Sequence, residues 1–285
     1  MSADGDAQTG IAATGGAPDW RAFFNRFARV VLIGNSHEAD PAALGRQFGD
    51  DTLFVFFNRV YKVLDAPFAG RRMLVARATD RGAIIVRSNV VDLVHPLMAG
   101  AGFEGVINLK GETMDRFDEP SAFRLGPVWP LDLSTVGQGL YPAGKVPSTG
   151  FAFLLWLLDL GLETRVALHC FTGERSPNWR NSRAHDWTFE QVALRFLLRS
   201  GRIDALDDHL TGDMWTDRIV ARFGGDRNAV AARAAEGLLR RVDVADRPAG
   251  EAWATQGPVR FPRQTPRLFG KRFSERFSVA RRTGK

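Results

Sequence analysis

The residues best suited to chemistry lie between Pro147 and Glu190. Ser148, Thr149 and Gly150 form a small polar turn directly before an apolar, helix-like run over residues 151–158. Such a turn offers two hydroxyl groups, free backbone N–H groups and the positive end of a helix dipole. Together these groups suit an anion, and we expect a phosphate or a sugar carboxylate to bind here.

A histidine and a glutamate lie near the start of a second predicted helix. Asp186 is a good N-cap for a helix over Trp187–Arg199, which places His185 just before the cap and Glu190 close behind it. An imidazole changes its charge close to neutral pH and therefore suits a general base. We expect His185 to face a ligand if the turn before it does.

Two asparagines follow segments that read as buried strands. Arg29–Ile33 leads into Asn35 and Ser36, and Thr52–Phe57 ends at Asn58. In open α/β sheets, ligands bind beyond the carboxyl ends of strands. An asparagine side chain offers one acceptor and two donors, which suits the edge of a pyrimidine or the hydroxyls of a ribose. An ordinary turn with asparagine in a left-handed conformation is the alternative.

Further strands and helices must position these residues. A run over residues 151–160, with Gly161 as its C-terminal cap, predicts a helix that packs on the sheet. Alternating strands and helical segments indicate an α/β fold with a mostly parallel sheet. We expect one such domain over residues 19–246. The other predicted strands are Arg72–Ala76, Ala83–Val86, Gly105–Leu109 and Arg165–Phe171.

The composition limits the class of protein. Of 285 residues, 45% are hydrophobic and 25% are charged, which is enough to bury a full core. A single cysteine excludes an intramolecular disulfide, and with no secretory signal or long apolar span we expect a cytoplasmic protein. The net charge of +6 favours an acidic partner.

The two ends of the chain differ from its middle. Residues 1–18 lack apolar periodicity, so we expect a disordered tail. Residues 247–285 form a basic extension in which Phe269, Phe273 and Phe277 recur every four residues. This pattern predicts an amphipathic helix that lies on an anionic membrane, at the periphery of the inner membrane. Binding to RNA or DNA and a plain solvated tail are the alternatives.

Three short motifs, in this order, resemble those of the eukaryotic-type sialyltransferase family (glycosyltransferase family 29). Gly34-Asn35-Ser36 with Asn58 is similar to the large sialyl motif. The segment 147–171 is similar to the small motif, and His185 with Glu190 is similar to the very small His-x4-Glu motif. We therefore regard the chain as similar to the soluble bacterial members of this family.

The resemblance implies a single Rossmann-like domain of the GT-A-variant kind and an inverting transfer that needs no metal and no cofactor. The donor would be CMP-activated sialic acid or Kdo, and the acceptor a glycan or lipid-linked glycan; nucleic acid is not the expected partner. His185 would be the catalytic base, and Glu190 would brace the local backbone. The implied donor-binding residues are Asn35, Ser36, Asn58, Ser148, Thr149 and Gly150.

Two residues depart from the family pattern. Phe56 stands where the family often has arginine, and Cys170-Phe171 stands where the small motif commonly ends in Gly-Phe. These departures and the basic extension suggest an alternative, a catalytically degenerate nucleotide- or nucleic-acid-binding protein on the same scaffold. We expect His169, inside an apolar strand, to be a hydrogen-bonded core residue.

Overall fold

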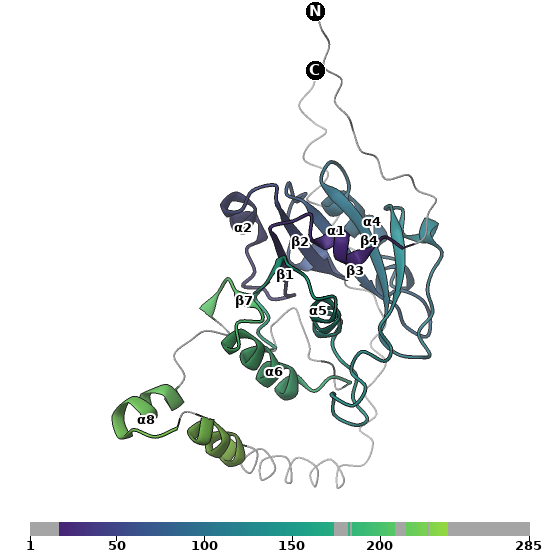
Figure 1. Cartoon of the computed structure of the whole chain (residues 1–285). Helices are drawn as coiled ribbons and strands as arrows, with labels where there is room; N and C mark the ends of the chain where they lie inside the picture. Colours follow the sequence, from purple (N-terminus) through teal and green to yellow (C-terminus); the bar gives the residue numbers. More distant parts are fainter. Residues whose placement is uncertain (1–16, 174–181, 183, 209–214, 227, 239–285) are drawn as a thin grey trace, which may run out of the picture. The chain divides into compact units, whose positions relative to one another are not determined.

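The computed structural model describes residues 17–173, 182, 184–208, 215–226 and 228–238 (Figure 1). The chain divides into two compact units, Met1–Gly212 and Asp213–Lys285, so the boundary between them falls inside the range 19–246 expected for one domain. The expected N-terminal tail is described only at residues 17 and 18. The basic extension over 247–285, with its predicted membrane helix, lies outside the described residues.

The first unit contains a seven-stranded sheet in which neighbouring strands run parallel. The order across the sheet is β5-β4-β3-β2-β1-β6-β7. This arrangement, with helices on both faces, confirms the predicted α/β class and is Rossmann-like. The strands are β1 Arg29–Ile33, β2 Thr52–Phe57, β3 Arg72–Arg77, β4 Phe103–Lys110, β5 Val128–Asp132, β6 Arg165–His169 and β7 Asp204–Ala205.

The strand order creates a switch point between β1 and β6. From β1 the chain builds β2 to β5 on one side and then returns to place β6 on the other side of β1. Ligands bind at such points in open α/β sheets, beyond the carboxyl ends of the strands. Here Gly34 N–H donates to the carbonyl of His169 at 2.7 Å. A Cβ on Gly34 would lie 2.2 Å from the carbonyl oxygen of Cys170, so only glycine fits this approach.

Helices cover both faces of the sheet, which makes three layers (Figure 1). Leu53 and Phe57 of β2 face one core, and Phe54 and Phe56 face the other, so the strand is buried on both sides. On the first face lie α1 Trp20–Phe24, α5 Thr149–Asp159 and α6 Trp187–Arg199. On the second lie α2 Pro41–Gln47, α3 Ile84–Arg87 and α4 Val91–Met98, with the 3-10 turns η1 Val60–Lys62 and η2 Pro120–Phe123.

The two helices that flank the switch point begin at polar N-caps. Asp186 is the cap expected from the sequence, whereas α5 begins at Thr149, earlier than the helix expected over residues 151–160. Ser148 Oγ accepts a hydrogen bond from Phe151 N–H at the start of α5. Asp186 accepts one from Phe189 N–H at the start of α6, whose range agrees with the prediction. Gly161 follows α5 with φ +60°, the left-handed conformation that ends helices and favours glycine.

The strand predicted over Ala83–Val86 is wrong, because this segment forms the short helix α3. A turn over residues 79–82 precedes it, and Ala83 N–H donates to the Asp118 carboxylate, so the chain turns away from the sheet. Four apolar residues alone do not distinguish a strand from a helix. Strand β6 is also shorter than predicted and ends at His169, since Cys170 has φ +56°.

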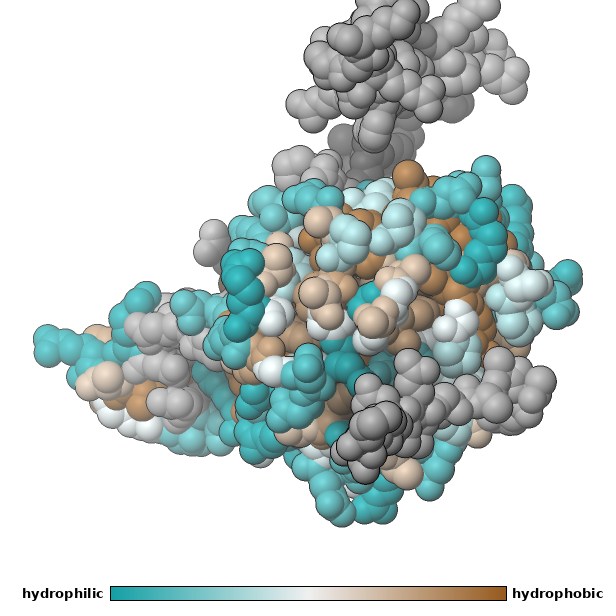
Figure 2. All heavy atoms as spheres, turned by 90° about the horizontal axis from the view of Figure 1, so that it is seen from above, coloured by the Kyte–Doolittle hydropathy of each residue, from teal (hydrophilic) through white to brown (hydrophobic). Residues whose placement is uncertain are grey.

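In the second unit the structure describes α8 Trp215–Phe223 and a helical segment over residues 228–238. Among the described residues, no helix is both long enough and apolar enough to cross a bilayer. The face shown in Figure 2 mixes apolar with hydrophilic side chains.

Candidate functional site

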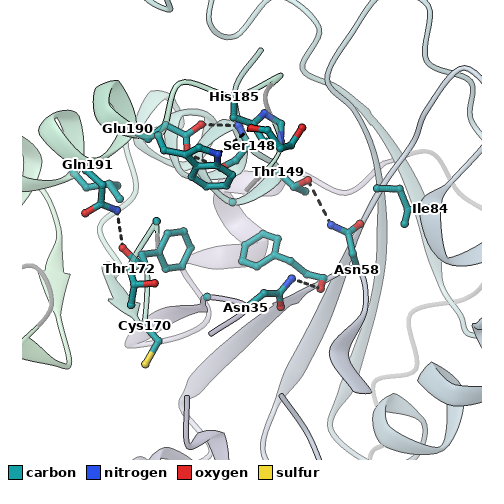
Figure 3. A pocket seen from close by; sticks show the side chains of 18 residues that line it. Asn35, Asn58, Ile84, Ser148, Thr149, Cys170, Thr172, His185, Glu190 and Gln191 are labelled. Carbon is teal, nitrogen blue, oxygen red and sulfur yellow. Dashed lines mark hydrogen bonds between the residues drawn. The ribbon is translucent and has the colours of Figure 1, made fainter. Parts of the chain in front are cut away.

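A cavity of about 270 Å³ lies at the switch point, beyond the carboxyl ends of β1, β2 and β6 (Figure 3). The starts of α5 and α6 supply much of the remaining described lining, and Ile84 of α3 also lines the cavity. Ser36 does not line the cavity; it is 7% exposed, and its Oγ accepts a hydrogen bond from Glu38 N–H at 3.3 Å. The other expected residues all line it: Asn35, Asn58, Ser148, Thr149, Gly150, His185 and Glu190.

The two asparagines have different roles in the cavity. Asn58 has φ +49°, its Oδ1 accepts from Arg77 N–H at 2.7 Å, and its Nδ2 lies 3.5 Å from Thr149 Oγ1. Asn58 therefore connects the strand ends to the start of α5. Asn35 Nδ2 donates to the Phe57 carbonyl at 3.2 Å, but its buried Oδ1 accepts no hydrogen bond from any described residue. Asn35 Oδ1 is thus an acceptor without a partner among the described residues, in a residue that lines the cavity.

In the Ser-Thr-Gly segment, Ser148 positions the start of α5, and Thr149 and Gly150 present their backbone N–H groups. Ser148 Oγ caps α5 and donates to Glu190 Oε2 at 2.7 Å, so its hydroxyl proton is already engaged. The N–H groups of Thr149 and Gly150 occupy the first turn of α5, where no intrahelical acceptor exists. A Cβ on Gly150 would lie 2.8 Å from the Phe171 ring, so only glycine lets this ring pack so closely against the start of α5. The N–H groups at this turn that remain available to a ligand are therefore those of Thr149 and Gly150.

Glu190 braces the start of α5, as the resemblance implies. The side chain is 3% exposed. Its Oε1 accepts hydrogen bonds from Tyr141 Oη at 2.8 Å and from Ser148 N–H at 2.7 Å, in addition to the contact with the Ser148 hydroxyl. Burial raises the pKa of Glu190, against the opposing effect of the hydrogen bonds from Ser148 and Tyr141. The carboxylate holds two segments together that are far apart in the sequence.

His185 is held by one of its two ring nitrogens. Nδ1 lies 2.8 Å from the Val146 carbonyl oxygen, which can only accept, so Nδ1 carries the proton. Val146 N–H donates in turn to the carbonyl of Ala184 at 2.9 Å, and the Trp187 ring meets the imidazole edge-on. In neutral His185, Nε2 is then the unprotonated nitrogen, as a general base requires.

Three positioning residues were not predicted from the sequence. Tyr141 Oη accepts from Asp186 N–H at 2.8 Å, which joins the loop before α5 to the cap of α6. Gln191 Nε2 donates to the carbonyl of Phe171 at 2.8 Å. Arg77, 7% exposed, donates from Nη1 to the carbonyl of Pro147 at 3.3 Å. Tyr141 could have been noticed in the sequence as an aromatic residue within a glycine-rich loop. The contacts of Gln191 and Arg77 depend on the fold and have no such local signal.

No lysine or arginine is present among the described residues that line the cavity. A bound anion would meet the N-terminus of α5 and neutral donors there. The segment between Gly173 and α6 carries three arginines that lie outside the described residues: Arg175, Arg180 and Arg183.

Both departures from the family pattern now have a structural account. Phe56 is fully buried in the core on the α2 and α4 face, away from the cavity. Cys170 takes φ +56°, the conformation that favours glycine, so the backbone keeps a glycine-like path. Burial, with the carboxylates of Asp207 and Glu38, raises the pKa of the Cys170 thiol to about 12. The protonated thiol is a poor nucleophile in this state.

Comparison with known proteins gave no match: no protein-family model, no curated protein and no solved structure matches the chain. The functional assignment therefore depends on the fold, on the motifs and on the geometry of the cavity.

Proposed function

We propose that the chain is an inverting glycosyltransferase that moves an acidic sugar, of the sialic acid or Kdo type, from a CMP donor to a glycan hydroxyl. One observation carries the proposal: a single cavity at the switch point contains the Asn35 acceptor, the N-terminus of α5 and the imidazole of His185. These groups come from the three motifs that resemble the sialyltransferase family.

Each group has a task in this reaction. The N–H groups of Thr149 and Gly150 would take up negative charge on the departing CMP phosphate. His185 Nε2 would accept the proton of the acceptor hydroxyl as its oxygen attacks the anomeric carbon. The sugar–phosphate bond breaks on the opposite face, which inverts the anomeric centre. The products are the glycoside and CMP, with the proton left on His185.

The proposal is tested by measuring the release of CMP from CMP-sialic acid and from CMP-Kdo. The rates are compared between the wild-type protein and His185→Gln. We expect turnover in His185→Gln to fall about 10²- to 10⁴-fold, while CMP affinity stays the same, because a base acts in the transition state. His95→Gln, an exposed histidine on α4, is the matched control. An equal loss of CMP affinity and turnover in His185→Gln would argue against the base role.

The degenerate nucleotide- or nucleic-acid-binding protein is the second candidate, suggested by the net charge of +6 and the basic extension over residues 247–285. A nucleic-acid binder should lose affinity for nucleic acid steeply as salt rises, and Asn35→Ala should not change that affinity. In a CMP-dependent enzyme, Asn35→Ala should weaken CMP binding. The cytoplasmic location and peripheral membrane contact stay predictions.

A further inference from the structure

Three side chains of metal-ligating type meet at the carboxyl end of β6. His169 ends this strand, Cys170 follows it, and Asp207 comes just after β7. His169 Nε2 lies 3.4 Å from Cys170 Sγ, and His169 Nδ1 lies 3.3 Å from Asp207 Oδ2. One ligand atom from each side chain can be chosen so that all three lie within 4.8 Å of one another. Tetrahedral zinc, with bonds of about 2.0–2.3 Å, separates its ligand atoms by roughly 3.3–3.8 Å and binds only one imidazole nitrogen, so the three side chains would close slightly around an ion.

The imidazole of His169 lacks a hydrogen bond that its burial demands. The residue is 9% exposed, and Nδ1 forms no hydrogen bond of acceptable geometry with any described residue, although Asp207 is near. A buried polar nitrogen without a hydrogen-bond partner destabilises the folded state. Sequence reasoning expected a hydrogen-bonded core histidine here, and Nδ1 does not meet that expectation.

The backbone at Cys170 is strained for a residue with a side chain. At a φ of +56°, a residue with a Cβ is less stable than in the right-handed conformation. Glycine would avoid this cost, so the cysteine is explained best by a role for its sulfur. The thiol points away from the centre of the cavity in Figure 3. Its Sγ lies 3.4 Å from His169 Nε2.

We propose that His169, Cys170 and Asp207 bind one zinc ion, with the fourth position open to water or another ligand. Imidazole nitrogen, thiolate and carboxylate are all common zinc ligands. Coordination deprotonates the thiol, and the released proton goes to solvent. A thiolate and a carboxylate balance the 2+ charge, so the buried site is neutral overall.

The ion would stabilise the wall of the cavity rather than take part in glycosyl transfer. Cys170 precedes Phe171, whose ring packs next to Gly150 and whose carbonyl accepts from Gln191. Holding the strand end at Cys170 therefore holds the ring that shapes the anion-binding turn. The proposal is independent of the proposed function, since it concerns ligands outside the catalytic set.

A cobalt titration of the full-length, metal-free protein tests the site. A thiolate–cobalt charge-transfer band in the near ultraviolet needs a cysteine ligand, and the chain has only one cysteine. We expect one equivalent of Co²⁺ to produce this band and zinc to abolish it. His169→Gln and Asp207→Asn should weaken cobalt binding at least about tenfold, whereas His95→Gln should not.

Cys170→Gly separates loss of the ligand from loss of the fold. Glycine suits the left-handed backbone, so this variant should stay folded by circular dichroism and lose the band completely. A folded wild-type protein that gives no thiolate–cobalt band would overturn the proposal. Unchanged cobalt affinity in both His169→Gln and Asp207→Asn would do the same.

Discussion

The brace at Glu190 gives the most detailed prediction. Glu190→Ala removes the acceptor of Tyr141 Oη and of Ser148 N–H, together with that of the Ser148 hydroxyl. Each donor left unpaired costs about 1–3 kcal/mol when buried. Since both segments are only partly buried, we expect the free energy of unfolding to fall by roughly 2–4 kcal/mol.

Glu190→Gln is the matched variant because it can keep all three contacts. The amide oxygen can accept from Tyr141 and from Ser148 N–H, and the amide nitrogen can donate to Ser148 Oγ. We therefore expect a change of less than about 1 kcal/mol at neutral pH. Glu119→Gln, at an exposed carboxylate, controls for the loss of one negative charge.

The same pair predicts a pH dependence. The folded state raises the pKa of Glu190, chiefly through burial, so the folded protein binds this proton more tightly than the unfolded chain. Protonation of Glu190 therefore contributes its full stabilisation below the pKa of the unfolded chain, near 4.5. This stabilisation is lost as pH rises through the higher pKa of the folded state. Glu190→Gln cannot ionise and should lack this decrease.

Urea unfolding of the three variants, followed by circular dichroism at a series of pH values, measures these effects. A Glu190→Ala midpoint that matches those of Glu190→Gln and Glu119→Gln would refute the brace. A Glu190→Gln protein that retains the full decrease with pH would show that another group is responsible.

Two further predictions concern the backbone at the switch point. Gly34→Ala places a Cβ 2.2 Å from the carbonyl oxygen of Cys170, so the free energy of unfolding should fall by about 3 kcal/mol or more. Urea unfolding measures this loss. Gly237→Ala is the control and should show no such loss, because its Cβ would meet no atom within 4 Å. Cys170→Gly should raise the free energy of unfolding of the metal-free protein by about 1 kcal/mol, because it removes the strain at φ +56°. Thermal unfolding in zinc-free buffer checks this, and a lower midpoint would count against the strain.

Much of the fold could be predicted because local signals are strong in it. Strands β1 and β2 are buried on both faces and therefore read as continuous apolar runs. The caps Ser148 and Asp186 have the polar side chains that helix starts favour. Strand β5 was missed because it contains Pro130, which a strand at the edge of a sheet tolerates.

The candidate site could be predicted only where its residues belong to short motifs. Asn35, Thr149 and His185 lie at strand ends or helix starts that sequence spacing identifies. The cluster of His169, Cys170 and Asp207 could not be found this way, since β7 brings Asp207 to β6 from 37 residues away. Contacts of this kind depend on strand order, which local patterns do not reveal.

The central claim is a CMP site at the switch point, and calorimetric titration of the full-length protein with CMP tests it most directly. UMP and GMP are the controls, in buffer without added divalent cation. We predict selective binding of CMP that weakens about 3- to 10-fold in Asn35→Ala, the expected cost of one lost hydrogen bond. Absence of CMP binding at millimolar ligand, or equal binding of all three nucleotides, would contradict the account.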